Sequence, residues 1–148
     1  MFKVRDSKAY RENKIRGFIA TEPGLAVLMA SAHFEWVVKR TILKVGHAPT
    51  RPLRQQLGAV YGLDRYKDAW REQVQHRTGV GLAGTVQNWS QVYDAFKLRG
   101  ALVHGAGSTS ARFAKRHVDV LLQAAEDVEA AARKCRVQLY RRLRARRS

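Results

Sequence analysis

The sequence predicts an all-α protein, an up-and-down bundle of about five helices in a single domain over residues 1–148. Apolar residues recur every three or four positions along several stretches, and no stretch shows the alternation of a half-buried strand. A chain of 148 residues with 45% hydrophobic content can bury one core. The three prolines, Pro23, Pro49 and Pro52, stand where helices can begin.

The first two helices are predicted over residues 7–19 and from residue 23 to about residue 45. Thr21, Glu22 and Pro23 supply an N-cap and an early proline, and Gly46 stops the second helix. This second helix is apolar on most of its surface. A helix of that kind belongs at the centre of a bundle.

Shorter helices are expected in the middle of the chain. One follows the prolines at 49 and 52 and carries Leu53 and Leu57. The next has Asp64 as its N-cap and apolar residues at helical spacing around Trp70. A loose loop then contains Gly79, Gly81 and Gly84.

The last two helices are predicted from Asn88 to Gly105 and from about Ala111 toward the C-terminus, joined by a Gly/Ser linker. The first has an apolar stripe of Trp89, Val92, Tyr93, Phe96 and Val103. The second is expected to extend as a long basic helix. Residues 133–148 hold eight Arg and Lys and no acid, which indicates an electrostatic arm for nucleic acid or, alternatively, a solvated helix end.

Charge sets the class of partner. The chain has 28 Lys and Arg against 12 Asp and Glu, a net charge of +16, and 19 of the 28 are Arg. Such an excess makes a polyanion the default partner, and the planar guanidinium binds phosphate oxygens bidentately. A small enzyme for cationic substrates is excluded.

The remaining composition points to the cytoplasm. The single cysteine, Cys135, excludes an internal disulfide framework and a Cys-rich zinc site, and it fits a reducing compartment. The first residues lack the apolar segment of a signal peptide. Charged residues interrupt the hydrophobic stretch Leu25–Val45, so no membrane span is expected. No histidine pair has the spacing of a metal site, and no cofactor is predicted.

Arg99 and His104 could carry chemistry. At about 100° per residue, Arg99 falls ~60° to one side of the stripe centred on Phe96 and His104 ~80° to the other. An imidazole can take a proton from a ribose 2′-OH or give one to the leaving oxygen, and a guanidinium can neutralise charge on the phosphoryl oxygens. The 2′-OH as nucleophile makes a metal unnecessary.

Arg99-x4-His104 followed by Gly105, on the penultimate helix of a basic all-α bundle, resembles the HEPN domain family. The stretch from Leu28 to Glu35 also resembles the HEPN helix in which small residues lead to an acidic residue facing the motif. The resemblance covers the layout from about Leu25 to Ala132.

The resemblance implies a metal-independent endoribonuclease that leaves a 2′,3′-cyclic phosphate and works as a homodimer with one composite site. It implies catalytic roles for Arg99 and His104, with Glu35 as the polar partner on the neighbouring helix. It suits a toxin of a toxin–antitoxin or phage-defence system, with a cognate antitoxin or another regulatory protein as a further partner. Ala106 replaces the Tyr of members silenced by a nucleotidyltransferase antitoxin, so that control is not expected.

Residue chemistry also suggests partners for these side chains. A carboxylate amid so much apolar surface needs a cation, and for Glu35 we expect Arg99, with a Glu35–Lys39 pair as the plainer alternative. Cations at a helix start are not favoured by the helix dipole, which hints at phosphate binding. The expected RNA contacts are Lys39, Lys97, Arg112, Lys115, Arg116, Arg141 and Arg142.

Two other functions stay open. Gly100 stands where active HEPN members usually carry a polar residue, which favours a catalytically silent module that binds RNA or a partner protein. The helices Arg51–Tyr61 and Asp64–Gln75 could mimic the helix-turn-helix of a DNA-binding regulator, although the second lacks an evident row of base-reading side chains.

Overall fold

The structure, a computed structural model, describes residues 2–60 and 62–147. Tyr61 and Ser148, which end two of the predicted segments, lie outside the described residues. The described residues form eight helices and no strand, which confirms the all-α prediction. The helices are α1 (Lys8–Gly17), α2 (Pro23–Val45), α3 (Thr50–Gly58), α4 (Leu63–Gln73), α5 (Gln75–Thr78), α6 (Leu82–Thr85), α7 (Trp89–Val103) and α8 (Ala111–Lys134).

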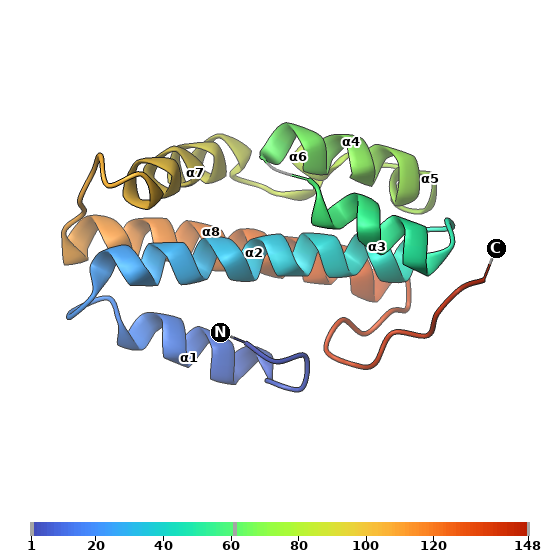
Figure 1. The fold of residues 1–148 in the computed structure, drawn as a ribbon, viewed down its shortest axis with the longest axis horizontal. Coiled ribbons are helices and arrows are strands. Elements are labelled where there is room, and N and C mark those ends of the chain that lie inside the picture. The colour runs from blue at the N-terminus through green and yellow to red at the C-terminus, as the bar shows by residue number, and fades with distance from the viewer. Residues whose placement is uncertain (1, 61, 148) are drawn as a thin grey trace.

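Helices α2 and α8 lie side by side through the middle of the bundle and begin at the same end (Figure 1). Helix α1 covers one side of this pair, and α3, α4, α6 and α7 cover the other. Both α1 and α7 run opposite to α2. One face of α2 therefore packs against α8, and another face packs against α7 and α4.

The burial of α2 follows from its sequence. Val27, Ala30, Phe34 and Val37 are fully buried, as expected for a helix that is apolar nearly all round. Of the predicted start signals, Glu22 is the N-cap, although no side-chain hydrogen bond caps the helix. Pro23 fills the first turn, where a missing N–H costs nothing. No helix in the two described ranges has the length and apolar character needed to cross a bilayer.

The middle segment is more ordered than its glycines suggest. The loop expected around residues 79–84 contains the short helix α6, whose Leu82 is buried in the core. Helix α4 begins one residue before Asp64: its N-cap is Gly62, with a φ of 83°, and Asp64 lies in the first turn. The carboxylate there still suits the positive end of the helix dipole.

The predicted basic C-terminal helix is wrong beyond Lys134. Helix α8 ends with Cys135 as its C-cap, and Arg136 takes a left-handed φ of 60°. The N–H of Val137 donates to the carbonyl of Ala132, the long bond of a Schellman turn. Residues 136–147, the C-terminal tail, then fold back as irregular chain.

This tail is tied to the far end of α2. Arg40 donates from Nε to the carbonyl of Leu139 at 3.0 Å and from Nη2 to that of Arg141 at 2.6 Å, and Lys44 donates to the Arg141 carbonyl at 2.7 Å. Arg146 donates to the carbonyls of Ala48 and Leu43. Side-chain donors pair with backbone carbonyls along the tail and at the end of α2, so the tail is held without secondary structure of its own.

Candidate functional site

Glu35 and Arg99 meet across the contact between α2 and α7. Arg99 Nη2 lies 3.2 Å from Glu35 Oε1, which confirms the predicted pairing. The Glu35 side chain is 16% exposed and that of Arg99 is 38% exposed, so the carboxylate is the deeper partner. Glu35 Oε1 accepts no aligned hydrogen bond, and the contact is an ion pair in which the oxygen keeps acceptor capacity.

Tyr66 on α4 completes the environment of the carboxylate. Its hydroxyl donates to Glu35 Oε2 at 2.7 Å, and its ring is buried. Lys39, the alternative partner of Glu35, places its Nζ 5.6 Å from the centre of the Tyr66 ring. Three helices thus fix one carboxylate, and this carboxylate holds Arg99 at the surface.

His104 is the C-cap of α7, where the chain leaves the helix. The N–H of Gly105, at a φ of 68°, donates to Leu102, and the N–H of Ala106 donates to Ala101, so the helix ends in a Schellman turn. This confirms Gly105 as the predicted stop. The imidazole lies on an exposed residue at the start of the connection to α8.

Arg99 and His104 face different sides of one molecule. They are five positions apart, and a helix turns about 100° per residue, so their directions differ by about 140°. Val103, predicted to share the buried stripe, is instead 60% exposed. Within one chain, therefore, the two side chains do not converge on a common point.

A groove of about 490 Å³ lies beside Arg99, between the start of α4 and the middle of α7. Tyr93 and Phe96 give it aromatic surface, and Lys97 and Arg65 give it positive charge beside the acid Asp64. Lys97 Nζ lies 5.3 Å from the centre of the Tyr93 ring. Such a lining can take an unstacked base against an aromatic ring with its phosphate near a cation.

The other expected RNA contacts fall on two further surfaces. Arg112, Lys115 and Arg116 lie exposed in the first turns of α8, where Lys115 is paired with Asp119 at 3.1 Å. Arg141 and Arg142 lie on the tail and are exposed. Of the cations predicted to contact RNA, Lys97 lines the groove and Lys39 lies over the Tyr66 ring, and the others lie at the start of α8 and on the tail.

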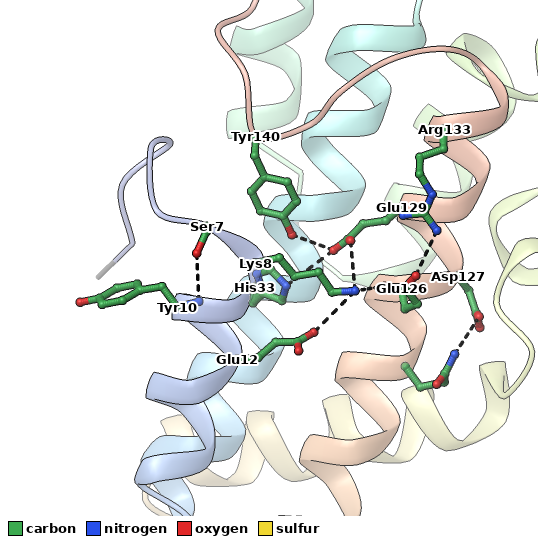
Figure 2. A network of polar contacts seen from close by, with 11 residues as sticks. Ser7, Lys8, Tyr10, Glu12, His33, Glu126, Asp127, Glu129, Arg133 and Tyr140 are labelled. Carbon is green, nitrogen blue, oxygen red and sulfur yellow. Dashed lines mark hydrogen bonds and ion pairs between the residues drawn. The ribbon is translucent and has the colours of Figure 1, made fainter.

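A polar cluster between α1, α2 and α8 was not predicted (Figure 2). Lys8 pairs with Glu126 and lies 3.6 Å from Glu129, which accepts a hydrogen bond of 2.7 Å from the Tyr140 hydroxyl. His33 Nε2 is 4.0 Å from Glu129, and neither ring nitrogen has a hydrogen bond partner among the described residues. Burial, then the charges of Arg11 and Lys8, lowers the pKa of His33 to about 4, so the ring is neutral at pH 7.

Sequence reasoning identified the Glu35–Arg99 pair but missed Tyr66 as a site residue. Tyr66 follows the apolar spacing of α4, and its ring is buried in the core; only its hydroxyl reaches the site. A buried tyrosine needs a partner for its hydroxyl, which is the signal that points to it.

Comparisons with protein-family models, with curated proteins and with solved structures return no match to this chain. Residues 2–60 and 62–147 contain no group of three or more His, Cys, Asp or Glu side chains placed to hold a metal ion. Glu35, Arg99 and His104 are therefore the residues whose geometry bears on function.

Proposed function

We propose that this chain is a metal-independent endoribonuclease of the HEPN type. The observation that carries the proposal is the ion pair of Glu35 on α2 with Arg99 on α7, five residues before the helix-ending His104. A half-buried carboxylate that orients a more exposed guanidinium is a fitting arrangement for holding a phosphate beside an imidazole.

The proposed reaction is transfer within the RNA chain. The ribose 2′-oxygen attacks phosphorus, the bond to the 5′-oxygen breaks, and a 2′,3′-cyclic phosphate and a 5′-hydroxyl result. One proton leaves the 2′-OH and one reaches the 5′-oxygen, and His104 acts in this transfer. Arg99 neutralises charge on the phosphoryl oxygens, and Glu35 positions Arg99.

A homodimer resolves the divergence of Arg99 and His104. Side chains that point about 140° apart in one chain can meet those of a second copy across a two-fold axis. Apolar surface at the end of the bundle that carries His104 supports a dimer contact there. Val103 beside His104 and Phe113 at the start of α8 are both more than half exposed. The ends of α7 and α8 that carry them are joined by one short connection (Figure 1).

The activity is tested by incubating purified protein with labelled RNA in excess chelator. We expect fragments that carry a 2′,3′-cyclic phosphate, identified by mass spectrometry. His104→Ala should lower the rate by about 10²–10⁴-fold, the usual contribution of general acid–base catalysis. His76→Ala, at another exposed histidine, is the matched control. An Arg99→Ala/His104→Ala variant that cuts RNA as fast as the parent would reject the mechanism.

The dimer is tested by light scattering and by Val103→Glu. This change places a carboxylate on the proposed contact without disturbing the core, and we expect it to give a folded monomer with little nuclease activity. Mixing Arg99→Ala with His104→Ala subunits provides the second test, because a mixed dimer keeps an intact residue of each kind. Recovery of activity on mixing is the expected result, and a parent that is monomeric while cutting RNA contradicts the composite site.

We further propose that the enzyme acts in the cytoplasm as a toxin or phage-defence effector controlled by an antitoxin or another regulatory protein. Expression of the parent and of His104→Ala in cells, with growth and RNA integrity followed together, tests this role. Growth arrest with RNA decay in the parent alone is expected.

The second candidate function is a catalytically silent module that binds RNA or a partner protein. Gly100 favours it, since no side chain follows the motif arginine. A Cβ at position 100 would meet no neighbouring heavy atom within 4 Å, so Gly100→Asn fits without strain. RNA binding that collapses with salt, with no fragments from either the parent or Gly100→Asn, would favour this candidate.

A further inference from the structure

We propose that a pocket beneath the C-terminal tail, here called the tail pocket, binds a phosphate group of a polynucleotide. It lies apart from the groove beside Arg99, and no residue lines both. The tail pocket has a volume of about 550 Å³. Its polar lining consists of Arg5, Arg40, Arg54, Arg142, Thr50 and Tyr140. No carboxylate lines it among the described residues.

Arg40 is the fixed member of this lining. It is 8% exposed, and its Nε and Nη2 are both committed to backbone carbonyls of the tail. Nη1 has no hydrogen bond partner among the residues that the structure describes. The guanidinium is therefore held in place before any ligand arrives, with donor capacity left over, and a preorganised donor loses little entropy on binding.

The four arginines lack an internal counter-charge. Some cations elsewhere in the chain are paired with acids, as in the 2.7 Å contact of Arg16 with Asp119. None of the four tail-pocket arginines forms an ion pair with a carboxylate in residues 2–60 and 62–147. Burial, then the charges of Arg54 and Arg11, lowers the pKa of Arg40. An external anion would relieve this repulsion.

The chemistry of the lining favours phosphate. Guanidinium groups bind phosphate oxygens bidentately, and Arg54 and Arg142 are exposed, so a ligand can reach them. The cavity exceeds the size of an isolated ion, which suits one phosphate with its attached sugar. The identification of the ligand as a polynucleotide rests on the proposed function and on the net charge of +16.

The test measures binding rather than cleavage, so it is independent of turnover. The probe is a short labelled 2′-O-methyl RNA, which lacks the nucleophile. Arg54→Gln/Arg142→Gln removes two lining charges and leaves Arg40, which anchors the tail, in place. The matched control is Arg51→Gln/Arg144→Gln, which removes two exposed arginines from the same helix and the same tail, outside the lining.

We expect the lining variant to bind the probe at least about tenfold more weakly than the parent. The slope of log K against log salt should decrease by about 1.4, since each single-strand phosphate contact contributes about 0.7. The control variant should change affinity less than about threefold. An equal loss in both variants would show that only net charge matters and would overturn the tail pocket.

Two further probes separate the sources of the anion. Inorganic phosphate that binds in a lining-dependent way, while affinity for the oligonucleotide stays unchanged in the lining variant, would assign the pocket to free phosphate and overturn the polynucleotide. Polyglutamate that binds as tightly as the RNA probe, with the same dependence, would assign it to an acidic protein and overturn it likewise. Lining-dependent RNA binding by a protein that cuts no RNA would support the pocket while rejecting the proposed nuclease.

Discussion

The hydroxyl of Tyr66 donates a 2.7 Å hydrogen bond to the carboxylate of Glu35, across the contact between α4 and α2. The same carboxylate holds Arg99 through its other oxygen. Tyr66 therefore reaches the proposed reaction through two intermediaries, as a positioning residue. A hydrogen bond to a charged group contributes about 1.5–3 kcal/mol, enough to set the orientation of Arg99.

Removal of either positioning group should lower RNA cleavage. We expect Glu35→Gln to reduce the rate by about ten- to hundredfold, since the loss of a charge-assisted contact of about 1.5–3 kcal/mol corresponds to this range. Tyr66→Phe should have a smaller effect in the same direction. In the Arg99→Ala background neither change should have a further effect, because there is no guanidinium left to position. Full additivity of the rate losses would contradict the positioning role.

The left-handed turn that ends α7 should be sensitive to substitution. Gly105 has a φ of 68°, which costs a residue with a Cβ about 1–2 kcal/mol. We expect Gly105→Ala to lower the free energy of unfolding in urea by about 1 kcal/mol. Ala106→Gly, one residue further along the same connection, is the control. Unchanged stability of Gly105→Ala would mean that the Schellman turn does not form.

At the end of α8, substitution by glycine should raise stability. Arg136 occupies the left-handed position that glycine usually fills, at a φ of 60°. Arg136→Gly should therefore raise the free energy of unfolding by about 0.5–1 kcal/mol, despite the loss of a charge. A lower denaturation midpoint for Arg136→Gly would argue that the helix continues past Lys134 in solution.

Acid should destabilise the fold through His33. The pKa of the buried ring is about 4, below the ordinary value of 6.5, so between these values the unfolded chain binds a proton that the folded chain does not. The free energy of unfolding should fall by about 3 kcal/mol as the pH falls from 6.5 to 4. Other charged or titratable groups near the His33 ring include Arg11, Lys8, Glu129 and Tyr140.

His33→Gln isolates this contribution, because every other titrating group is retained. Urea midpoints measured at several pH values between 7 and 4.5 should fall less steeply for the variant than for the parent. Parallel curves for the two proteins would show that His33 is protonated as readily in the folded as in the unfolded state.

The tail should loosen when Arg146, the side chain of the tail that bonds the end of α2, is removed. Arg146 donates to the carbonyls of Ala48 and Leu43 at 2.9 and 2.8 Å. Two hydrogen bonds of about 1 kcal/mol each oppose opening, so Arg146→Ala should raise proteolysis after Tyr140 by about tenfold or more. The protease should be specific for aromatic residues, and Arg144→Ala, on the exposed neighbour, is the control. Equal cleavage of both variants would contradict the anchoring.

Local signals predicted much of the fold. The first helix begins where it was predicted, with Ser7 as the N-cap of α1; Ser110 of the predicted Gly/Ser linker caps α8, and Gly105 stops α7. The end of α8 was missed because Arg136 carries no sequence signature of a left-handed turn. That turn is bonded by a distant side chain: Arg77, 58 positions earlier in the chain, donates from Nη2 to the carbonyl of Cys135 at 2.9 Å.

The candidate site was predictable where the sequence places a charged side chain in apolar surroundings that leave it without a partner. Glu35 on an apolar helix required a cation, and the resemblance to the HEPN family favoured Arg99 over the alternative, Lys39. The position of Tyr66 depends on how α4 packs across α2, which no local pattern encodes. The same holds for the cluster of Lys8, His33 and Glu129, whose members come from three helices.

The tail is attached to α2 mainly through its own peptide oxygens, which Arg40 and Lys44 bind without regard to the residue types that carry them. The side chains of Arg141 and Arg142 are consequently released from any duty in folding. Substitution of these two exposed arginines should therefore change the surface charge of the tail and leave its path along α2 unchanged.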